Sequence, residues 1–327
     1  MKLSVHLLDQ PDPAALAHLR DHLDAGVHLT LGPDLPVPAN YQVLVTGRPR
    51  REHLAASPHL RALIVPFAGL PDTTRELLMS DFPHLAVHNL HYNAGPVAET
   101  VIALMLAAAK FIVPIDRALR AHDWTPRYRP NPSLLLEGKT ALILGYGAIG
   151  QRVAHLCRGL GMKVVATRRS VAAPSLDAPD DVYPPHALHD LLPQADALII
   201  CLPHTPETTG LIGEGELALL PPGALLVNVG RGPIVDEAVL YHALREGTLH
   251  AAALDVWYNY PADEAARPHT PPSAYPFHQL DNVVMSPHRA SHFDGKETLR
   301  MRHLAALLNA AARGQAMPNR VDLEAGY

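Results

Sequence analysis

The stretch Gly145-Tyr146-Gly147-Ala148-Ile149-Gly150 decides the fold of this chain. It follows the apolar run Thr140–Leu144, which is typical of a buried strand, and it opens the helical pattern Ala148–Leu160. A G-x-G-x-x-G turn is a weak signal alone. In the order strand, turn and helix, it indicates a dinucleotide-binding βαβ unit.

Each residue of this loop has a physical task. Gly145 permits the tight turn, Gly147 lets a pyrophosphate approach the backbone, and Gly150 lets the helix pack closely on the strand. The first N–H groups of the helix, from Ala148 and Ile149 onward, have no partner inside it and favour a phosphate. We therefore predict cofactor contacts at these five residues. Glycines that serve packing alone are the alternative.

The rest of the chain has the composition of an ordinary globular protein. Its 327 residues predict two domains, at about 100–200 residues each. Hydrophobic residues make up 48% and charged residues 18%, which excludes a disordered chain. The net charge of -5 leaves no basic excess to meet phosphates, so we expect no nucleic-acid partner. We attribute the 32 Pro, the 21 His and the preference for Arg over Lys to compositional background.

Compartment and membrane signals point to a cytoplasmic protein. The two cysteines, Cys157 and Cys201, cannot build a disulfide framework, which favours a reducing compartment. The N-terminus has no secretory signal pattern. The most apolar run, Thr100–Ile115, is shorter than the roughly 20 residues that span a bilayer. We expect a buried helix there and no membrane association. Metal-ligand spacing is absent, so we expect no metal.

Strands and helices alternate along the chain, which predicts an α/β protein with parallel sheets. The strands expected in the first region are Lys2–Leu8, Tyr41–Thr46, Arg61–Pro66 and Leu85–Asn89. Those expected in the second are Thr140–Leu144, Lys163–Thr167, Ala197–Cys201, Ala224–Asn228, Ala251–Val256 and Val283–Ser286. Helices are expected at Pro13–Leu23, Arg51–Ala56, Thr73–Asp81, Val97–Ile112, Ala148–Leu160 and Ser291–Arg313. The fold class is therefore two doubly wound parallel-sheet domains, a Rossmann cofactor domain and a flavodoxin-like domain, with a cleft between them.

The residues that follow the second strand of the dinucleotide unit select its cofactor. An acidic residue there holds the ribose hydroxyls of NAD. This sequence has Thr167, Arg168, Arg169 and Ser170, with Arg168 at the acidic position. An Arg offers a bidentate fork to a 2′-phosphate, which an acid would repel. We predict contacts from these four residues and a preference for NADP over NAD. A solvated pair of loop arginines is the alternative.

Three further strand ends carry reactive side chains. Arg231 lies between glycines after one strand, Asp255 follows the next, and His288 follows the last. The carboxyl ends of parallel strands are where α/β sheets bind ligands. An Arg can hold a carboxylate through two parallel hydrogen bonds, and a His exchanges protons near neutral pH. The order glycine loop, Arg, Asp, His distinguishes His288 from the other histidines.

These motifs resemble those of the D-isomer-specific 2-hydroxyacid dehydrogenases, a family that includes glyoxylate/hydroxypyruvate reductases. The resemblance covers nearly the whole chain and is strongest over Asn93–Glu99, Gly138–Gly150, Leu202–Thr208, Asn228–Asp236, Leu254–Val256 and Ser286–His288. It implies a substrate domain of residues 1–95 with 291–327, a cofactor domain of residues 96–290, and a homodimer.

The resemblance also implies a reaction and roles for residues. A small 2-oxo acid and a D-2-hydroxy acid would be interconverted by hydride transfer. His288 would be the acid/base, and Arg231 would hold the substrate carboxylate and polarise its carbonyl. The backbone N–H groups of Ala68 and Gly69 would receive the same carboxylate. Asn93 matches a substrate-side position of some members.

Further cofactor contacts follow from the same resemblance. Asp255 would lie at the nicotinamide end. The remaining contacts would come from Leu202, Pro203, Thr208, Val229 and Gly230.

One position departs from the family pattern. The family has a Glu five residues after the Asp, where it orients the His and raises its pKa. Here that residue is Tyr260. Tyrosine can hydrogen-bond an imidazole, so we group it with the catalytic residues, but it supplies no negative charge at neutral pH. Two alternatives stay open: a formate- or phosphite-like hydride-abstracting dehydrogenase, and a catalytically weak NAD(P)-sensing binding protein.

The predicted site is also unusually basic. Arg289 directly follows His288, and His292 lies about one helical turn further on. This pattern predicts a substrate with a second anionic group, bound through Arg289. The alternative is that Arg289 and His292 face solvent or a dimer partner.

Overall fold

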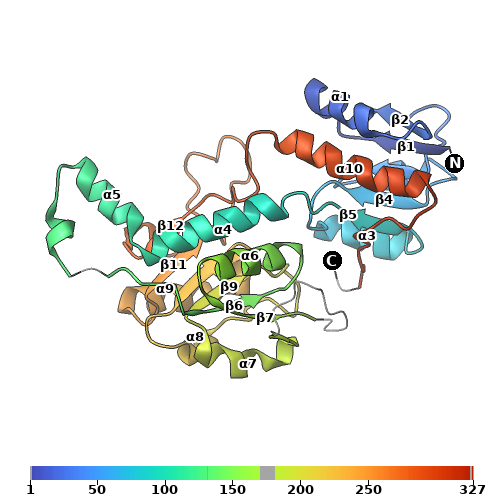
Figure 1. The fold of residues 1–327 in the computed structure, drawn as a ribbon. Coiled ribbons are helices and arrows are strands. Elements are labelled where there is room, and N and C mark those ends of the chain that lie inside the picture. Colours follow the sequence, from blue (N-terminus) through green and yellow to red (C-terminus); the bar gives the residue numbers. More distant parts are fainter. Residues whose placement is uncertain (1, 131, 170–180, 325, 327) are drawn as a thin grey trace. The chain divides into compact units, whose positions relative to one another are not determined.

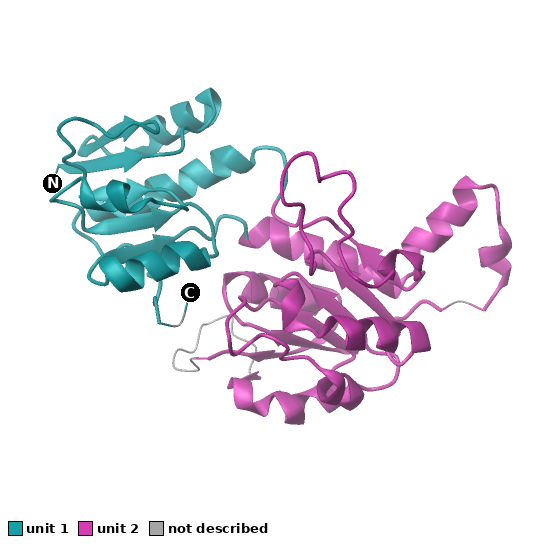
Figure 2. Ribbon diagram, turned by 180° about the vertical axis from the view of Figure 1, so that it is seen from behind, with its two compact units in different colours: residues 1–93, 292–327 teal, residues 94–291 magenta. Residues whose placement is uncertain are grey.

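The computed structural model describes the whole chain except residues 1, 131, 170–180, 325 and 327. Contacts between residues divide the chain into two compact units (Figure 2). Unit 1 consists of residues 1–93 and 292–327, and unit 2 of residues 94–291. The sequence analysis expected residues 1–95 with 291–327 and residues 96–290, which differs by two residues at the first boundary and by one at the second.

Unit 1 is built on a five-stranded, fully parallel sheet (Figure 1). In spatial order its strands are β2 (Val27–Leu31), β1 (Leu3–Leu7), β3 (Val43–Val45), β4 (Ala62–Val65) and β5 (Ala86–Asn89). Four of these strands were expected. Each expected strand began one or two residues before the observed one, and all but β5 also ended one residue after it. β2 was missed although its sequence VHLTL alternates apolar and polar residues, because the prediction relied on continuous apolar runs and β2 is a partly exposed edge strand.

Helices cover both faces of this sheet. α1 (Pro13–His22) and α10 (Lys296–Ala312) pack on one face, and α2 (Arg51–Ala55) and α3 (Asp72–Asp81) on the other. The start of α1 is set locally, because the Asp12 side chain accepts a hydrogen bond from the Ala15 backbone N–H at 2.8 Å. α10 begins five residues later than expected and ends one residue earlier. Its apolar side completes the core of unit 1 beside α1.

The C-terminal tail lies along the outer edge of β5. The Val321 N–H donates to the Val87 carbonyl at 2.8 Å, and the Asn89 N–H donates to the Asn319 carbonyl at 3.1 Å. An antiparallel bridge joins His88 to Arg320. The tail therefore occupies backbone groups that an edge strand would leave open.

Unit 2 is built on a seven-stranded parallel sheet. In spatial order its strands are β12 (Val283–Met285), β11 (Ala251–Leu254), β10 (Leu225–Asn228), β9 (Ala197–Ile200), β6 (Thr140–Leu144), β7 (Lys163–Thr167) and β8 (Val182–Tyr183). The chain winds outward from β6 in both directions, so the strand order reverses between β6 and β9. That reversal is the topological switch point at which doubly wound sheets bind ligands. All six expected strands are present, and only the two-residue β8 was missed.

The faces of this sheet are covered by two sets of helices. α4 (Ala94–Ala109) and α6 (Ala148–Gly159) lie on one face, and α7 (Leu188–Leu191), α8 (Glu214–Leu219) and α9 (Glu237–Glu246) on the other. Successive residues of β6 alternate between the two cores, as strand geometry requires: Ile143 packs with the first set and Leu142 with the second. Short 3-10 turns complete the described part at Thr125–Tyr128, Pro185–Ala187, Leu192–Gln194, Gly232–Ile234 and Phe277–Gln279.

The long apolar helix expected to reach Ile112 ends earlier, which corrects the sequence analysis. α4 stops at Ala109, Phe111 takes a left-handed backbone conformation with φ of 53°, and α5 (Ile112–Arg120) leaves at 67° to α4. No residue of α5 is buried. No single helix of the described residues is long and apolar enough to cross a membrane. The bent pair α4 and α5 meets that test by length and composition only.

Candidate active site

The glycine loop joins β6 to α6 in unit 2 and leaves room for a phosphate. Gly145 has a φ of +97°, which favours glycine. A side chain on Gly150 would collide with the Gly145 carbonyl, whereas Gly147 faces open space. α6 begins at Ala148 without a side-chain cap, so its first N–H groups have no partner inside the helix. The loop therefore fits the pyrophosphate of a dinucleotide.

The end of β7 lies beside this loop. The buried Thr167 holds it there, because its carbonyl accepts the N–H groups of Gly145 and Tyr146 at 3.2 and 2.9 Å. Arg168 follows directly and its N–H donates to the Tyr183 carbonyl at 2.9 Å. Arg169 is exposed, and Ser170 lies outside the described residues. The structure thus places a cation at the strand end where NAD-binding sheets carry an acid.

Hydrogen bonds of the Thr208 side chain hold the segment after β9 in a turn. The Thr208 hydroxyl donates to the Pro203 carbonyl at 2.8 Å and accepts from the Thr205 N–H at 2.8 Å. Leu202 lies against the turn after β10: a Cβ on Gly230 would be 2.6 Å from the Leu202 carbonyl oxygen. Only glycine permits this close approach of two backbones.

Arg231 lies in a turn that is stabilised by the buried side-chain amide of Asn228. Asn228, the last residue of β10, accepts from the Gly230 N–H at 3.0 Å and donates to the Arg231 carbonyl at 2.9 Å. Val229 lies between them and packs into the core. The Arg231 side chain is exposed and donates to the Gly230 carbonyl at 2.7 Å. Within the described chain no carboxylate lies within 4.0 Å of its guanidinium, so it can take an external one.

Tyr260 lies against His288. The Tyr260 hydroxyl is 3.0 Å from the His288 Nδ1, and the ring centroids are 5.6 Å apart. The same hydroxyl accepts a hydrogen bond from the Trp257 N–H at 3.2 Å. Partial burial raises the pKa of Tyr260, although the nearby Arg231 charge opposes the shift. The phenol is therefore neutral at neutral pH.

The loop that carries His288 is wound around the Asp255 carboxylate. His288 has a φ of 57°, a left-handed conformation that costs energy for a non-glycine residue. Asp255, 1% exposed, accepts hydrogen bonds from the N–H groups of Arg289 and Ala290 at 2.8 and 3.0 Å and from the Ser286 hydroxyl. These bonds hold the loop in its strained form. The contact of Asp255 with the nicotinamide end stays a prediction.

Sequence reasoning missed two residues that support this loop. Ser286 donates to Asp255, and the Trp257 indole N–H donates to the Ser286 carbonyl at 2.8 Å. Both stand beside residues that were selected, but their partners depend on the register of β11 with β12, where Leu254 pairs with Met285. No local pattern of the sequence contains that register.

The expected substrate-side residues Ala68, Gly69 and Asn93 lie in unit 1. Ala68 and Gly69 belong to the loop after β4, and neither backbone N–H has an acceptor in the described part of the chain. The Asn93 Oδ1 is buried, with no hydrogen-bond partner among the residues placed by the structure. Arg289 follows His288 in unit 2 with an exposed side chain, and His292, in unit 1, is also exposed.

Metal-binding side chains do not cluster in the described residues: no group of three or more His, Cys, Asp or Glu there could hold an ion. The expectation of a metal-free protein stays a prediction.

A glycine-loop nucleotide fold with Arg, Tyr and His at its sheet edge defines an NAD(P)-binding oxidoreductase. The chain belongs to the D-isomer specific 2-hydroxyacid dehydrogenases, because the NAD binding domain of that family matches residues 102–290.

Two proteins with similar sequences are given as examples. The chain is 43% identical over 235 residues to a glyoxylate reductase of Aeropyrum pernix, an alignment that covers 69% of this chain and 66% of that protein. It is 32% identical over 341 residues to a D-3-phosphoglycerate dehydrogenase of Mycobacterium tuberculosis, covering 100% of this chain and 60% of that protein. The chain therefore spans at most about two thirds of the length of these relatives.

Solved structures share the fold over the full length. A D-isomer specific 2-hydroxyacid dehydrogenase from Xanthobacter autotrophicus Py2, in complex with NADPH and MES, has a TM-score of 0.79 at 24% identity, with 100% of both chains covered. An NADPH-dependent glyoxylate/hydroxypyruvate reductase from Sinorhizobium meliloti, in complex with NADP and sulfate, has a TM-score of 0.77 at 21% identity, again with 100% of both chains covered. These likenesses confirm the expected two-sheet α/β fold.

Proposed function

We propose that this protein is an NADP-dependent oxidoreductase that interconverts a small 2-oxo acid and a D-2-hydroxy acid. The observation that carries the proposal is the arrangement at one edge of the unit 2 sheet. Arg231, Tyr260 and His288 follow the adjacent strands β10, β11 and β12, and the Tyr260 hydroxyl contacts the His288 imidazole. A fixed cation and an oriented imidazole are what reduction of a carboxylate-bearing ketone needs.

The side chains divide the work of the reaction. The bound nicotinamide supplies the hydride in reduction and accepts it in oxidation. Arg231 holds the substrate carboxylate by two parallel hydrogen bonds and draws electron density from the adjacent carbonyl. His288, protonated before reduction, gives its proton to the substrate oxygen as the hydride reaches carbon, and takes it back in the reverse direction. Tyr260 contacts Nδ1, so the proposal assigns this proton transfer to the other ring nitrogen, Nε2.

Tyr260 replaces the family Glu in a way that keeps acid/base chemistry possible. A hydroxyl both donates and accepts hydrogen bonds. Its oxygen can accept from Nδ1–H when His288 is charged, and it can still accept from Nδ1–H in the neutral tautomer that remains once Nε2 has given up its proton. A carboxylate would favour only the charged form. Tyr260 therefore orients the imidazole in both states without biasing it toward the cation.

The cofactor preference rests on Arg168. It follows β7 directly, and among the described residues its side chain has neither an ion pair nor a hydrogen bond with another side chain. A guanidinium in this place suits the 2′-phosphate of NADP. The substrate of the proposed reaction is a small anionic acid.

A homodimer is also proposed, through α5 and the segment after it. α5 exposes Ile112, Val113, Ile115 and Leu119, and Trp124 beyond it is 62% exposed. A run of exposed apolar side chains on one arm is typical of a protein interface. A second copy of this chain is the occupant that the family resemblance implies.

One screen tests the proposed activity. Purified protein is mixed with NADPH and glyoxylate, hydroxypyruvate, pyruvate, 2-oxoglutarate or phosphohydroxypyruvate, and the loss of NADPH absorbance is followed. We expect reduction of at least one acid and its loss in the Arg231→Ala variant. Tight NADPH binding with no turnover would favour the sensing protein. Reduction of NADP by formate or phosphite, without oxo-acid reduction, would favour the hydride-abstracting dehydrogenase. Faster turnover with phosphohydroxypyruvate, lost in Arg289→Ala, would support the second-anion hypothesis.

A further inference from the structure

The loop Pro66–Leu70 of unit 1, here called the β4 loop, is held by contacts on two sides. The Phe67 ring lies over Gly47 so closely that a Cβ there would collide with it. On the other side, the Asn89 amide donates from Nδ2 to the Ala68 carbonyl at 2.6 Å. Gly47 follows the neighbouring strand β3, and Asn89 ends the neighbouring strand β5. Neither contact was anticipated from the sequence.

Asn89 reaches this loop because of strand register. It is the last residue of β5 and pairs with Val65, the last residue of β4, from which the β4 loop continues. Its side chain is only 4% exposed. The contact with the Ala68 carbonyl orients the amide, since a flipped amide would set one oxygen against another.

That orientation leaves the other end of the amide unsatisfied. The Asn89 Oδ1 is buried and has no hydrogen-bond partner in the described part of the chain. Buried acceptors without a donor are rare and destabilising, and each needs an explanation. A role for the Nδ2 hydrogen bond would explain it, because that bond fixes the amide in the orientation that leaves Oδ1 without a donor.

The C-terminal tail holds Asn89 from outside. Asn319 accepts the Asn89 N–H at 3.1 Å through its carbonyl and donates from Nδ2 to the Asn89 carbonyl at 3.1 Å. Asn319 has a φ of 56°, a conformation that asparagine tolerates better than most residues. Both backbone groups of Asn89 are thus held by one residue of the tail.

We infer that Asn89 is a positioning residue that aims the Gly69 N–H at the substrate carboxylate. The Ala68 carbonyl and the Gly69 N–H belong to one planar trans peptide, so they point in opposite directions. When Asn89 holds the carbonyl, the direction of the N–H is set, and that N–H has no acceptor among the described residues. The inference rests on the proposed function, together with the family resemblance, which implies that the N–H groups of Ala68 and Gly69 also receive the substrate carboxylate.

The test compares Asn89→Ala and Asn89→Asp with Ser57→Ala. Ser57 is a matched control in unit 1, because it is 5% exposed and its hydroxyl donates to a backbone carbonyl, that of Tyr41, at 2.6 Å, far from the β4 loop. KM and kcat for the best oxo acid, the Kd for NADPH, and the Kd for the unreactive analogue oxamate on the NADPH complex are measured. Thermal unfolding is recorded for all variants.

We expect KM and the oxamate Kd to rise about tenfold in both Asn89 variants, the effect of losing one well-placed hydrogen bond. The NADPH Kd should stay unchanged, and Ser57→Ala should lose stability without a change in KM. If an Asn89 variant does not fold, Asn319→Gly, which keeps the left-handed backbone, should raise KM in the same direction. An unchanged KM, or equal changes in Asn89→Ala and Ser57→Ala, would overturn the inference.

A crystal structure of Asn89→Ala separates this inference from the proposed function. It needs no substrate and should show the Ala68–Gly69 peptide rotated from its present plane. An unrotated peptide overturns the positioning role even if the enzyme reduces oxo acids. Absence of oxo-acid reduction in the wild type would instead overturn the proposed function.

Discussion

At the scale of single residues, the chemistry depends on which neutral or charged group stands beside each reacting side chain. Tyr260 gives His288 a neutral partner 3.0 Å from Nδ1. The Asp255 carboxylate instead accepts hydrogen bonds from the backbone of the loop that carries His288. The carboxylate that the family places against the imidazole is thus absent from that position. The local electrostatics of proton transfer should differ accordingly.

Tyr260 should control the pH dependence of reduction. Reduction consumes a proton that His288 gives, so kcat/KM should fall as the pH rises. In Tyr260→Glu a carboxylate would favour the charged form, and the fall should move to higher pH. In Tyr260→Phe, kcat should drop by about 10–100-fold because the imidazole loses its orienting bond. The pH profile of kcat/KM measures both.

Tyr258→Phe is the control for these variants. Its hydroxyl donates to the Val235 carbonyl at 3.0 Å, in the same segment but away from His288. Its profile should match that of the wild type. A Tyr260→Glu profile that also matches would contradict the role given to Tyr260.

Arg168 should decide the cofactor. In Arg168→Asp the fork for a 2′-phosphate is replaced by a carboxylate that repels it and can hold ribose hydroxyls. The ratio of kcat/KM for NADPH to that for NADH should fall about 100-fold. Lys163→Asp makes the same change of charge at the opposite end of β7 and should leave the ratio unaltered. A wild type that prefers NADH, with no change in Arg168→Asp, would refute the NADP assignment.

At the scale of elements, sequence patterns located the strands well and the helix ends less well. Every strand in the interior of the two sheets appears where apolar runs predict it. The edge strands β2 and β8 were missed: β8 has only two residues, and β2 alternates apolar and polar residues, a pattern of half-buried strands that a search for continuous apolar runs passes over. Apolar residues continue from α4 into α5, so the sequence pattern did not reveal the break at Phe111. Only α4 is packed in the core.

The exposed face of α5 should hold the dimer together. Leu119→Glu places a charge on that face and should convert the protein to monomers, as measured by light scattering after size-exclusion chromatography. Leu219→Glu, an equally drastic change of a partly exposed leucine on α8, should leave the mass unchanged. A monomeric wild type, or a dimeric Leu119→Glu variant, would exclude this interface.

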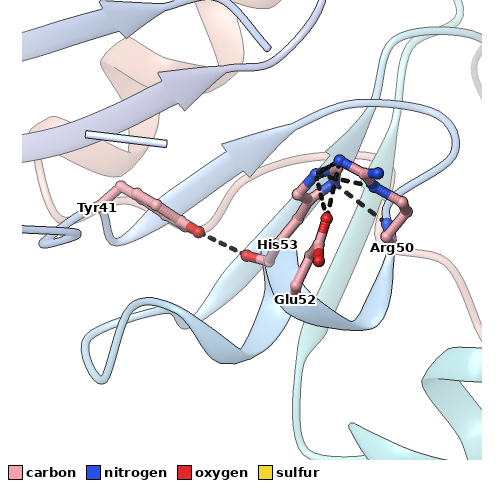
Figure 3. Close-up of polar contacts among 4 residues, drawn as sticks. All are labelled: Tyr41, Arg50, Glu52 and His53. Carbon is pink, nitrogen blue, oxygen red and sulfur yellow. Dashed lines mark hydrogen bonds and ion pairs between the residues drawn. The ribbon is translucent and has the colours of Figure 1, made fainter. Parts of the chain in front are cut away.

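At the scale of the whole molecule, unit 1 should respond to acid through its buried histidines. Burial lowers the pKa of four described histidines of unit 1, namely His6, His53, His88 and His91. Figure 3 shows one of these sites, where the Arg50 guanidinium adds its charge to the effect of burial on His53, while Glu52 opposes it. His6, 1% exposed, has an Nε2 without a partner in the described chain.

Acid should therefore destabilise unit 1. A histidine with a lowered folded pKa binds fewer protons folded than unfolded, so its contribution to stability is present above the ordinary pKa of about 6.5 and is lost as the pH falls below it. The melting temperature of unit 1 should drop between about pH 6.5 and 5, and His6→Leu should reduce the drop. His84→Leu, on the exposed surface, should not. An identical acid dependence in all three proteins would contradict this account.

The sequence by itself determined the fold class, the ten strands other than β2 and β8, and the residue types at the ends of β6, β7, β10, β11 and β12. It could do so because apolar periodicity and the glycine turn are local patterns that act over a few residues. Only the tertiary structure decided that Asn89 meets the Ala68 carbonyl and that Asp255 meets the backbone after His288, whereas the contact of Tyr260 with the imidazole was already expected from the family resemblance. Those contacts join residues that lie apart in sequence. They depend on strand register and on loops wound around buried groups, which no short stretch of sequence encodes.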